Sequence, residues 1–534
     1  MPPRALRRFA GLLALVLCCS AHAVAFKWAS QDDAATMDPD AFNHGPTMTV
    51  LGHIYEGLVR RDREQRIEPA LAQSWTQPAP TVWRFRLREG VRFHDGSLLT
   101  AEDVVFSLKR AMTPESDMKV FAASIADVKA VDATTVDVVT EFPNAALLQS
   151  LPELKVMSKA WAEKNGALRP ADMRQKSENF ATRNTNGTGP FKLSVREPDV
   201  RTVLVAHTGW WDKPGTNITE ATMVKISSAA TRVAALLSGE LDFAYPIPLQ
   251  DIPRVEASTG YKVLQGPEIR NLFLSMDQAS PELRYASVKG KNPFADRRVR
   301  LAIYQAIDIE AIGKRILRDS AVPTGILVPR GVNSVDTAMV ARPFPYDLAA
   351  AKKLLAEAGF ADGFDTELFV MNTDPQPRIA QSIQQDLAKV GIRAQIKSLA
   401  QANVIAAGGD KDQAPMVWSG GMAWIADFPD PSNFWGPILG CEGAVPGGWN
   451  WAWYCNEELD AEADAADAMV APDQQQARAE RWGKIFTTAM DDAPWVPIFN
   501  EQRFTVHSAR MGGDDALYVD PVHVPVNYDY IWVK

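Results

Sequence analysis

A tryptophan-rich stretch between residues 418 and 460 restricts the possible folds of this chain more than any other segment. It contains six of the fifteen tryptophans, at positions Trp418, Trp424, Trp435, Trp449, Trp451 and Trp453. Glycine and proline residues interrupt the stretch, so it cannot form one regular amphipathic helix. Large flat side chains on loops are good linings for small-molecule pockets, but they also fill hydrophobic cores. The stretch therefore predicts either a pocket wall or a core layer.

The N-terminal segment has the pattern of a secretory signal peptide. Three arginines are followed by an apolar segment at residues 9–19 and by a small-residue cleavage site that ends at Ala23. The apolar segment is too short to span a membrane. A lipoprotein signal needs a small residue before the cysteine, whereas the large Leu17 precedes Cys18. We expect cleavage after Ala23 and an exported, soluble protein without a lipid anchor.

The chain is long and acidic. A length of 534 residues is too great for one hydrophobic core and predicts two or three lobes. Removal of the signal peptide changes the formal net charge from −9 to −12. This excess of negative charge argues against binding to nucleic acid or to anionic lipid surfaces. No later segment is apolar over a membrane-spanning length, so we expect no membrane span in the mature chain.

Signal cleavage leaves two cysteines, Cys441 and Cys455, which are fourteen positions apart. In an exported protein such a pair most simply forms a disulfide. A zinc site is a poor alternative because no histidine lies between them. The disulfide would hold residues 449–453 of the tryptophan-rich stretch beside Asp427.

Hydrophobic periodicity predicts an α/β chain with mixed sheets. Residues 26–30 are predicted to form a short strand, residues 82–87 have the alternation of a strand, and residues 47–58 have the pattern of a helix. Another helix is expected to begin after Thr100, with Asp103 at the capping-box position. Apolar residues also recur at helical spacing between residues 297 and 315.

Several motifs follow one another along the chain. They are L-A-Q-S-W (71–75), F-R-L-R-E-G-V-R-F-H-D-G (85–96), L-T-A-E-D-V-V-F-S-L-K-R (99–110), G-T-G-P-F (187–191), P-F-A-D-R-R-V-R-L-A-I (293–303), A-I-D (306–308), Y-D-L-A-A-A-K-K-L-L-A-E-A-G-F (346–360) and W-I-A-D-F-P-D-P-S-N-F (424–434). In this order they closely resemble the family 5 extracytoplasmic solute-binding proteins, which are the oligopeptide- and dipeptide-binding proteins of ABC importers. The resemblance covers essentially the whole mature sequence.

The resemblance implies an α/β periplasmic-binding-protein fold, type II-like and of class C (cluster C), with two lobes joined by a hinge and an extra inserted domain. The implied division is a signal peptide at 1–23, lobe I at 24–57, 184–278 and 501–534, an inserted domain at 58–183, and lobe II at 279–500. Such boundaries are accurate only to several residues.

The implied function is capture without chemistry. The protein would bind di- and oligopeptides in the cleft between its lobes, in the periplasm, and dock on an ABC permease whose ATPase subunits drive import. We expect a monomer that uses no cofactor and no metal. An enzyme is not expected, since the chain lacks G-x-S-x-G, H-E-x-x-H and G-x-x-x-x-G-K-[ST] motifs.

Other ligands remain open under the same transport role. Relatives of this fold carry nickel chelates, haem, glutathione, opines or oligosaccharides, and a sensory protein that docks on a receptor is a further alternative. Asp427 favours a ligand that bears an ammonium group, and hence peptides or amino-acid conjugates. A nickel or haem site would need a His or Met cluster near the cleft, where His44 is the only candidate.

Asp427 is the first candidate for ligand binding. In peptide-binding members of the family, the aspartate of the W-x-x-D motif pairs with the α-ammonium group of the ligand, and Asp427 matches that position. A carboxylate in a closed, water-poor cleft forms a strong charge-assisted bond. The alternative is that the Asp427 carboxylate caps a loop or accepts a hydrogen bond within a turn. Asp430, in contrast, precedes Pro431 and has the pattern of a helix N-cap, so we interpret it as structural.

The remaining candidates surround this position. Trp424 would pack beside the ligand, and the backbone of Ala423 would bond to an extended peptide. The pocket walls and the opposite side of the cleft are assigned to Trp449, Asn450, Trp451, Asn43 and His44, each with ordinary packing or local hydrogen bonding as the alternative. Arg378 is the only candidate for the ligand carboxylate after strand 367–371. Because residues 372–377 separate the strand from Arg378, the peptide length stays open.

Overall fold

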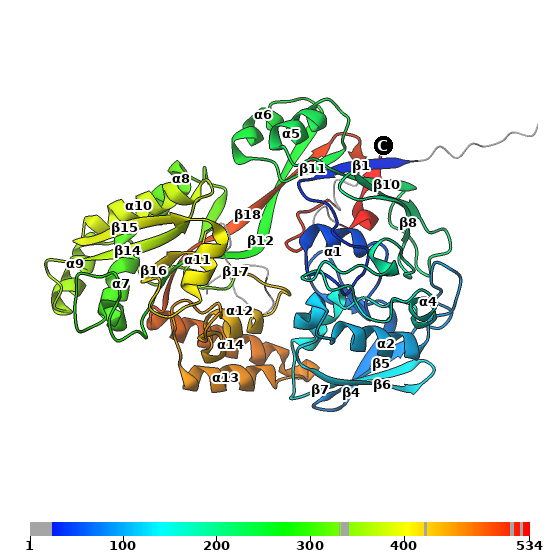
Figure 1. Ribbon diagram of the computed structural model, residues 1–534, viewed down its shortest axis with the longest axis horizontal. Helices are drawn as coiled ribbons and strands as arrows, with labels where there is room; N and C mark the ends of the chain where they lie inside the picture. The colour runs from blue at the N-terminus through cyan, green and yellow to red at the C-terminus, as the bar shows by residue number, and fades with distance from the viewer. Residues whose placement is uncertain (1–23, 330–331, 333–340, 421–423, 513–516, 524–526) are drawn as a thin grey trace, which may run out of the picture.

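The computed structural model describes residues 24–329, 332, 341–420, 424–512, 517–523 and 527–534. The predicted signal peptide and Ala423 lie outside these residues. Figure 1 shows two halves beside one another, with two long strands running diagonally between them. Within the described ranges, no helix has both the length and the apolar character needed to cross a bilayer.

One mixed sheet extends through both halves. In spatial order it contains β15 (Ile392–Leu399), β14 (Phe364–Met371), β16 (Met416–Trp418), β12 (Tyr261–Met276), β18 (Trp495–Ser508), β11 (Phe243–Tyr245), β1 (Ala25–Ser30), β10 (Glu220–Lys225), β9 (Arg201–Ala206) and β8 (Phe191–Glu197). Two short strands pair with it from the side, β13 (Ala321–Pro323) on β18 and β17 (Trp424–Ile425) on β12. Parallel pairs within each half and antiparallel pairs between β12 and β18 give the predicted mixed α/β sheet.

Strands β12 and β18 carry the chain from one half to the other (Figure 1). They pair from Tyr261–Ser508 to Pro267–Gln502, and pairing resumes at Asn271–Asn500 after a register shift. The shift releases residues 268–270 of β12 from β18. Arg270 pairs instead with Ile425 of β17. The backbone between the halves is therefore shaped by an irregularity of the kind that bends strands and redirects side chains.

A second, antiparallel sheet lies in the right half of Figure 1. Its order is β4 (Ala72–Ala79), β5 (Val82–Leu87), β7 (Thr135–Thr140) and β6 (Ile125–Asp132). Two small pairs complete the described sheets, β2 (Val59–Arg61) with β3 (Ile67–Pro69) and β19 (Met511–Gly512) with β20 (Trp532–Val533).

The helices cover the sheet faces in both halves. The α-helices are α1 (Gly45–Leu51), α2 (Ala101–Ala111), α3 (Leu147–Ser150), α4 (Lys159–Lys164), α5 (Ala229–Leu237), α6 (Ile252–Glu256), α7 (Arg297–Ala306), α8 (Ile309–Arg315), α9 (Leu348–Glu357), α10 (Gln376–Ala388), α11 (Gln401–Gly408), α12 (Ser432–Ile438), α13 (Glu457–Asp467) and α14 (Gln475–Asp491). As predicted, α2 begins after Thr100, whose N–H donates to the Asp103 carboxylate over 2.9 Å.

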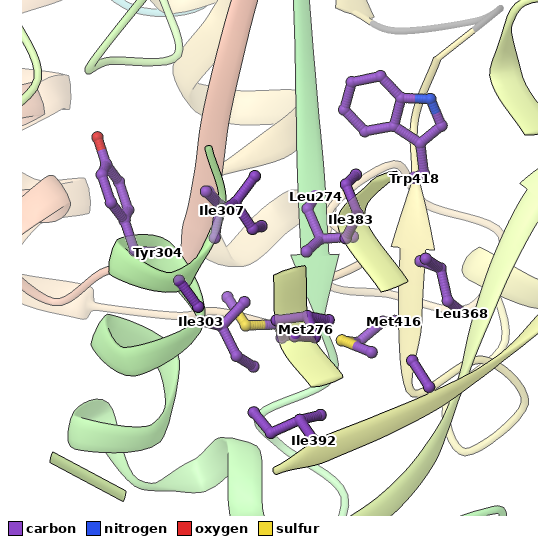
Figure 2. Packing of buried hydrophobic residues seen from close by; sticks show 14 of the residues in the cluster. Leu274, Met276, Ile303, Tyr304, Ile307, Leu368, Ile383, Ile392, Met416 and Trp418 are labelled. Atoms are coloured by element: carbon purple, nitrogen blue, oxygen red, sulfur yellow. The ribbon is translucent and has the colours of Figure 1, made fainter. Parts of the chain in front are cut away.

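The left half is built on a core between the sheet and its helices. Figure 2 shows Leu274 and Met276 of β12 packed with Leu368 of β14 and Ile383 of α10. Trp418, at the end of β16, is fully buried in the same cluster. Part of the tryptophan-rich stretch is therefore a core layer.

Candidate ligand-binding cleft

A hollow of about 380 Å³ lies where the two halves meet. One wall comes from Asn43 and the start of α1, and another from residues 268–270 of β12 and residues 425–427. Pro521–His523, near the C-terminus, also line the hollow, together with Trp28, Ser30, Phe121, Tyr245 and Arg503. The walls of this hollow therefore come from distant parts of the chain.

Asp427 lines the hollow two residues after β17. Its carboxylate accepts a hydrogen bond from Asn43 Nδ2 over 3.0 Å, across the gap between the halves. Its own N–H donates to Asn433 Oδ1 over 2.8 Å, which orients the residue. Burial raises the pKa of Asp427, and the Asn43 hydrogen bond offsets only part of the rise. Among the described residues, Asp427 has no cationic partner, so the hollow contains a carboxylate available to a positively charged group.

Asp430 has a structural role, as the sequence predicts, but it acts through an ion pair as well as at the start of a helix. Helix α12 begins at Ser432, whose N–H donates to Asp430 over 3.0 Å. The carboxylate also forms a buried two-bond ion pair with Arg478 of α14, over 3.0 and 2.8 Å. Arg478 in turn binds Asp467 over 2.8 Å. Asp430 therefore ties α12 to α13 and α14 and does not face the hollow.

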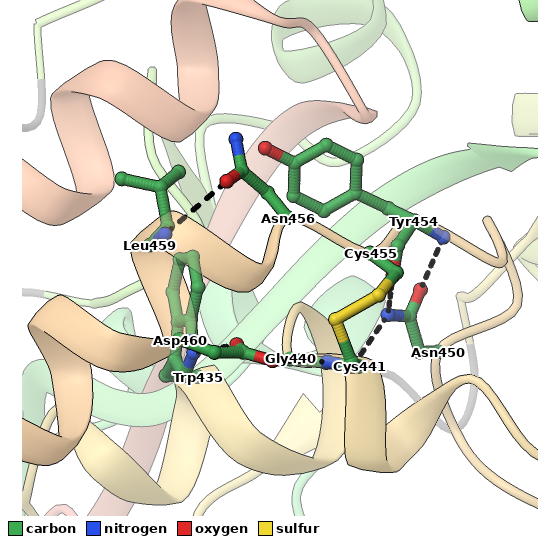
Figure 3. The surroundings of a disulfide bond; sticks show 9 residues. All are labelled: Trp435, Gly440, Cys441, Asn450, Tyr454, Cys455, Asn456, Leu459 and Asp460. Carbon is green, nitrogen blue, oxygen red and sulfur yellow. Dashed lines mark hydrogen bonds between the residues drawn. A yellow bond between two sulfur atoms is a disulfide. The ribbon is translucent and has the colours of Figure 1, made fainter.

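The disulfide between Cys441 and Cys455 is present, as predicted, with an S–S distance of 2.00 Å. Figure 3 shows how it closes the loop that carries Asn450. The Asn450 side chain is buried and donates to the carbonyls of Gly440 and Tyr454, over 3.0 and 2.8 Å. Its amide is thus used to hold the loop.

The three tryptophans of the predicted pocket wall form a row. The Trp449 ring lies edge-on to Trp424, with centroids 6.1 Å apart, and stacks on Trp451 at 5.7 Å. Trp451 is buried, whereas 38% of Trp449 is exposed. Trp424 Nε1 donates to the Asn433 carbonyl over 2.7 Å. Asn433 connects this row to Asp427, because it binds both Trp424 and the Asp427 N–H. None of the three tryptophans is among the described residues that line the hollow.

The other candidates are distributed more widely. His44 bonds to Thr47 over 3.1 Å and stacks on Phe42, so of the Asn43–His44 pair only Asn43 lines the hollow. Arg378 lies on α10, forms an exposed ion pair with Asp374 at 2.8 Å and lines a different hollow beside Arg315. The structure thus does not bring Arg378 to Asp427.

Sequence reasoning missed a set of charged residues in the hollow. Glu268 accepts hydrogen bonds from Arg503 of β18 over 3.0 Å and from Arg270 over 3.3 Å. Burial alone would raise the pKa of Glu268. The two guanidinium groups outweigh this effect and lower the pKa to about 2. No motif marks the three residues, since Arg503 lies more than two hundred positions from the others. The local sequence signal for this set is the pair of charged residues Glu268 and Arg270 in β12, which is largely apolar after Arg270.

Two α/β halves that share a continuous pair of strands and enclose a charged hollow define a solute-binding protein. The chain belongs to the bacterial extracellular solute-binding proteins, family 5, whose family model matches residues 66–445. The predicted family is thereby confirmed, together with the prediction that the protein binds a solute and is not an enzyme.

Individual relatives cover nearly the whole chain. The glutathione-binding protein GsiB of Escherichia coli K12 is 27% identical over 514 residues, which cover 94% of this chain and 93% of its own. The periplasmic binding protein DppA of Helicobacter pylori, solved with the peptide STSA, has a TM-score of 0.73 and 25% identity, and the match covers 96% of this chain and 98% of DppA. HbpA2 of Haemophilus parasuis has a TM-score of 0.81 and 22% identity, over 96% of this chain and 100% of its own. These similarities confirm the predicted two-lobed fold.

Proposed function

We propose that this solute-binding protein captures short peptides in the hollow beside Asp427, as the periplasmic binding component of an ABC importer. The observation that carries the proposal is the half-buried Asp427 carboxylate, which lines the hollow. In the described part of the chain, its only hydrogen-bond donor from another side chain is Asn43. A peptide ammonium group supplies the missing positive charge and three N–H donors.

The relatives support the same ligand class. DppA was solved with a bound peptide, and GsiB is named for glutathione, which is itself a tripeptide-like compound with an ammonium group. Glutathione is therefore the second candidate, and it uses the same carboxylate.

Capture would proceed by closure of the halves around the ligand. Contacts between them already exist at Asn43–Asp427, between the rings of Phe121 and Phe428 at 6.5 Å, and from Ala145 N–H to the Asp467 carbonyl over 2.8 Å. A ligand that touches both walls favours the closed form because it binds that form more tightly. The closed form would then dock on the permease and ATPase subunits.

The remaining features of the proposal come from the sequence. The protein is a monomer, is exported by cleavage after Ala23 and is free in the periplasm. Lobe I comprises residues 24–57, 184–278 and 501–534, lobe II residues 279–500, and the inserted domain residues 58–183. The four-stranded sheet β4-β5-β7-β6 falls inside the proposed insert, which supports this division.

The proposed function is tested by identifying the ligands that leave the freshly purified protein on denaturation. Mass spectrometry is expected to find a mixture of short peptides with free N-termini. The Asp427→Asn variant, which keeps the shape and removes the charge, is expected to yield none. Asp374→Asn is the matched control, because Asp374 is exposed and lies in another hollow. A single non-peptide compound would contradict the peptide assignment and leave the family role intact.

A further inference from the structure

A second hollow, of about 630 Å³, lies away from Asp427. Its walls include Arg315 and Arg318 at the end of α8, Arg378 at the start of α10, and residues 248–250 between β11 and α6. Figure 1 shows α6, α8 and α10 on one side of the strands β12 and β18, and α1, β17 and α12 on the other. Among the described residues, none lines both hollows. The second hollow is therefore a separate feature of the molecule.

The lining of this second hollow carries an excess of positive charge. It contains three arginines and one carboxylate, that of Asp374. Asp374 pairs with Arg378 through two hydrogen bonds, over 2.9 and 2.8 Å. Within the described part of the chain, the side chains of Arg315 and Arg318 form no hydrogen bond or ion pair. Two guanidinium charges are thus uncompensated in one hollow of a chain whose overall charge is strongly negative.

The turn that carries Arg318 is held in place by the tertiary structure. Arg318 and Asp319 both adopt left-handed backbone conformations, with φ of 52° and 59°, which are uncommon for residues other than glycine. The Asp319 N–H donates to the Gly313 carbonyl over 3.1 Å, while the Asp319 carboxylate is not part of the lining. The dipole of α8 explains a cation at Arg315, in its last turn, but not at Arg318 beyond the helix. The backbone that presents Arg318 is therefore fixed before any anion binds.

We propose that Arg315 and Arg318 form a second binding site, which takes a soluble anion that bears a phosphate group, and that Arg378 completes its positive wall. A guanidinium group offers phosphate oxygens two parallel N–H donors. Near pH 7 a phosphate group carries close to two negative charges, which match the two uncompensated arginines. The volume of the hollow also admits larger compounds such as pyrophosphate. This site is independent of Asp427 and goes beyond the proposed peptide function.

Calorimetric titration of the full mature protein with inorganic pyrophosphate tests the site. We expect one saturable binding event that weakens as sodium chloride is added, because the guanidinium groups are exposed and salt screens them. The Arg315→Gln, Arg318→Gln double variant is expected to bind pyrophosphate at least about 10-fold more weakly, since each substitution removes a charge-assisted donor pair. Circular dichroism checks that the variant is folded.

The Lys314→Gln, Arg393→Gln double variant is the matched control. It removes the same charge from the same half, at two exposed residues outside the hollow, and should bind pyrophosphate like the wild type. Leu249→Glu tests the opposite wall of the hollow. A carboxylate placed there should also weaken pyrophosphate binding, because it repels the anion.

Several results would overturn the inference. These are the absence of saturable binding to the wild type, and equal binding by the wild type and the Arg315→Gln, Arg318→Gln variant, which would place the anion elsewhere. Equal weakening in the control variant would show that net charge, and not the hollow, attracts pyrophosphate. Citrate serves as a carboxylate anion for comparison, and tighter binding of citrate than of pyrophosphate would refute the phosphate assignment. None of these results bears on the peptide proposal, because the two hollows share no described residue.

Discussion

At the scale of single residues, the chemistry of the cleft depends on how far each charge is compensated. Asp430 and Asp427 are three positions apart in one motif, but their surroundings differ. Asp430 is buried against the Arg478 guanidinium, whereas the Asp427 carboxylate has, among the residues that the structure describes, the Asn43 amide as its only side-chain donor. A buried compensated carboxylate stabilises a particular arrangement of helices, and an uncompensated carboxylate in a hollow is suited to a ligand.

Binding should weaken on acidification because of Asp427. Burial raises the pKa of this carboxyl, the Asn43 hydrogen bond lowers it in part, and the charge of Glu153 raises it again. A peptide ammonium has a pKa of about 8 and stays charged below pH 7, so within the proposed ammonium–carboxylate pair it is Asp427 that loses its charge on acidification. We expect the dissociation constant to increase as the pH falls from 7 towards 4, at a higher pH than an ordinary aspartate would produce. Titration calorimetry across this range checks it, and a flat profile for wild-type protein would contradict it.

The ion pair of Arg478 should contribute strongly to stability. Arg478→Met leaves the buried Asp430 and the half-buried Asp467 without this counter-charge. We therefore expect the free energy of unfolding at pH 7 to fall by about 3–5 kcal/mol. Urea unfolding monitored by circular dichroism measures the change. The control is Arg378→Met, which breaks an exposed pair and should alter the same quantity by less than about 1 kcal/mol. Similar decreases in the free energy of unfolding for the two variants would contradict the prediction that the buried ion pair contributes more than the exposed one.

At the scale of elements, the loop between Cys441 and Cys455 connects the tryptophan row to the helices below the cleft. The Asp460 carboxylate of α13 accepts hydrogen bonds from Trp435 Nε1 over 2.7 Å and from the Cys441 N–H over 3.0 Å. One end of the disulfide is therefore attached to α12 and α13 through a single side chain, as Figure 3 shows. The loop is a fixed part of this half.

Reduction of the disulfide should destabilise the protein. A loop of this length corresponds to about 3 kcal/mol in the chain-entropy description, because the open form gains conformational freedom when it unfolds. We expect a lower unfolding temperature for the Cys441→Ser, Cys455→Ser double variant, and more weakly protected amides at residues 449–453. Calorimetry and hydrogen exchange measure the two effects. Unchanged protection of this segment would show that the hydrogen bonds of Asn450 hold the loop without the disulfide.

Element boundaries show the limits of periodicity. Helix α1 ends at Leu51, whereas the apolar pattern extends to residue 58, because Gly52 follows and the chain turns towards β2. The helical pattern of residues 297–315 is divided into α7 and α8, since Asp308 caps a new helix by accepting from Ala311 N–H over 3.0 Å. A local capping bond interrupts a pattern that hydrophobic spacing alone would continue.

At the scale of the whole molecule, β12 and β18 are the covalent route between the halves, and side-chain contacts between the halves decide how closely they approach. The Phe428 ring contacts Phe121 across the boundary, with centroids 6.5 Å apart. Both residues flank the hollow, since Phe121 lines it and Phe428 follows Asp427. In the proposed capture mechanism, closure and ligand binding would be coupled through these adjacent residues.

Loss of this ring contact should favour the open form. We expect Phe428→Ala to increase the radius of gyration of the ligand-free protein in small-angle X-ray scattering and to weaken peptide binding, because closure then costs more free energy. Phe142→Ala, at an exposed phenylalanine, is the control and should change neither quantity. A variant that stays as compact as the wild type and binds equally well would show that the contact does not contribute to closure.

The sequence by itself determined the family, the α/β class and the disulfide, and it marked Asp427 as the first candidate for ligand binding, because these depend on motifs, local periodicity and the small number of cysteines. Only the tertiary structure placed Trp418 in a core, occupied the Asn450 amide within its loop, kept Arg378 away from Asp427 and brought Arg270, Glu268 and Arg503 to one hollow. The physical reason is the distance along the chain. Burial and charge compensation are set by neighbours in space, and here those neighbours come from strands more than two hundred residues apart.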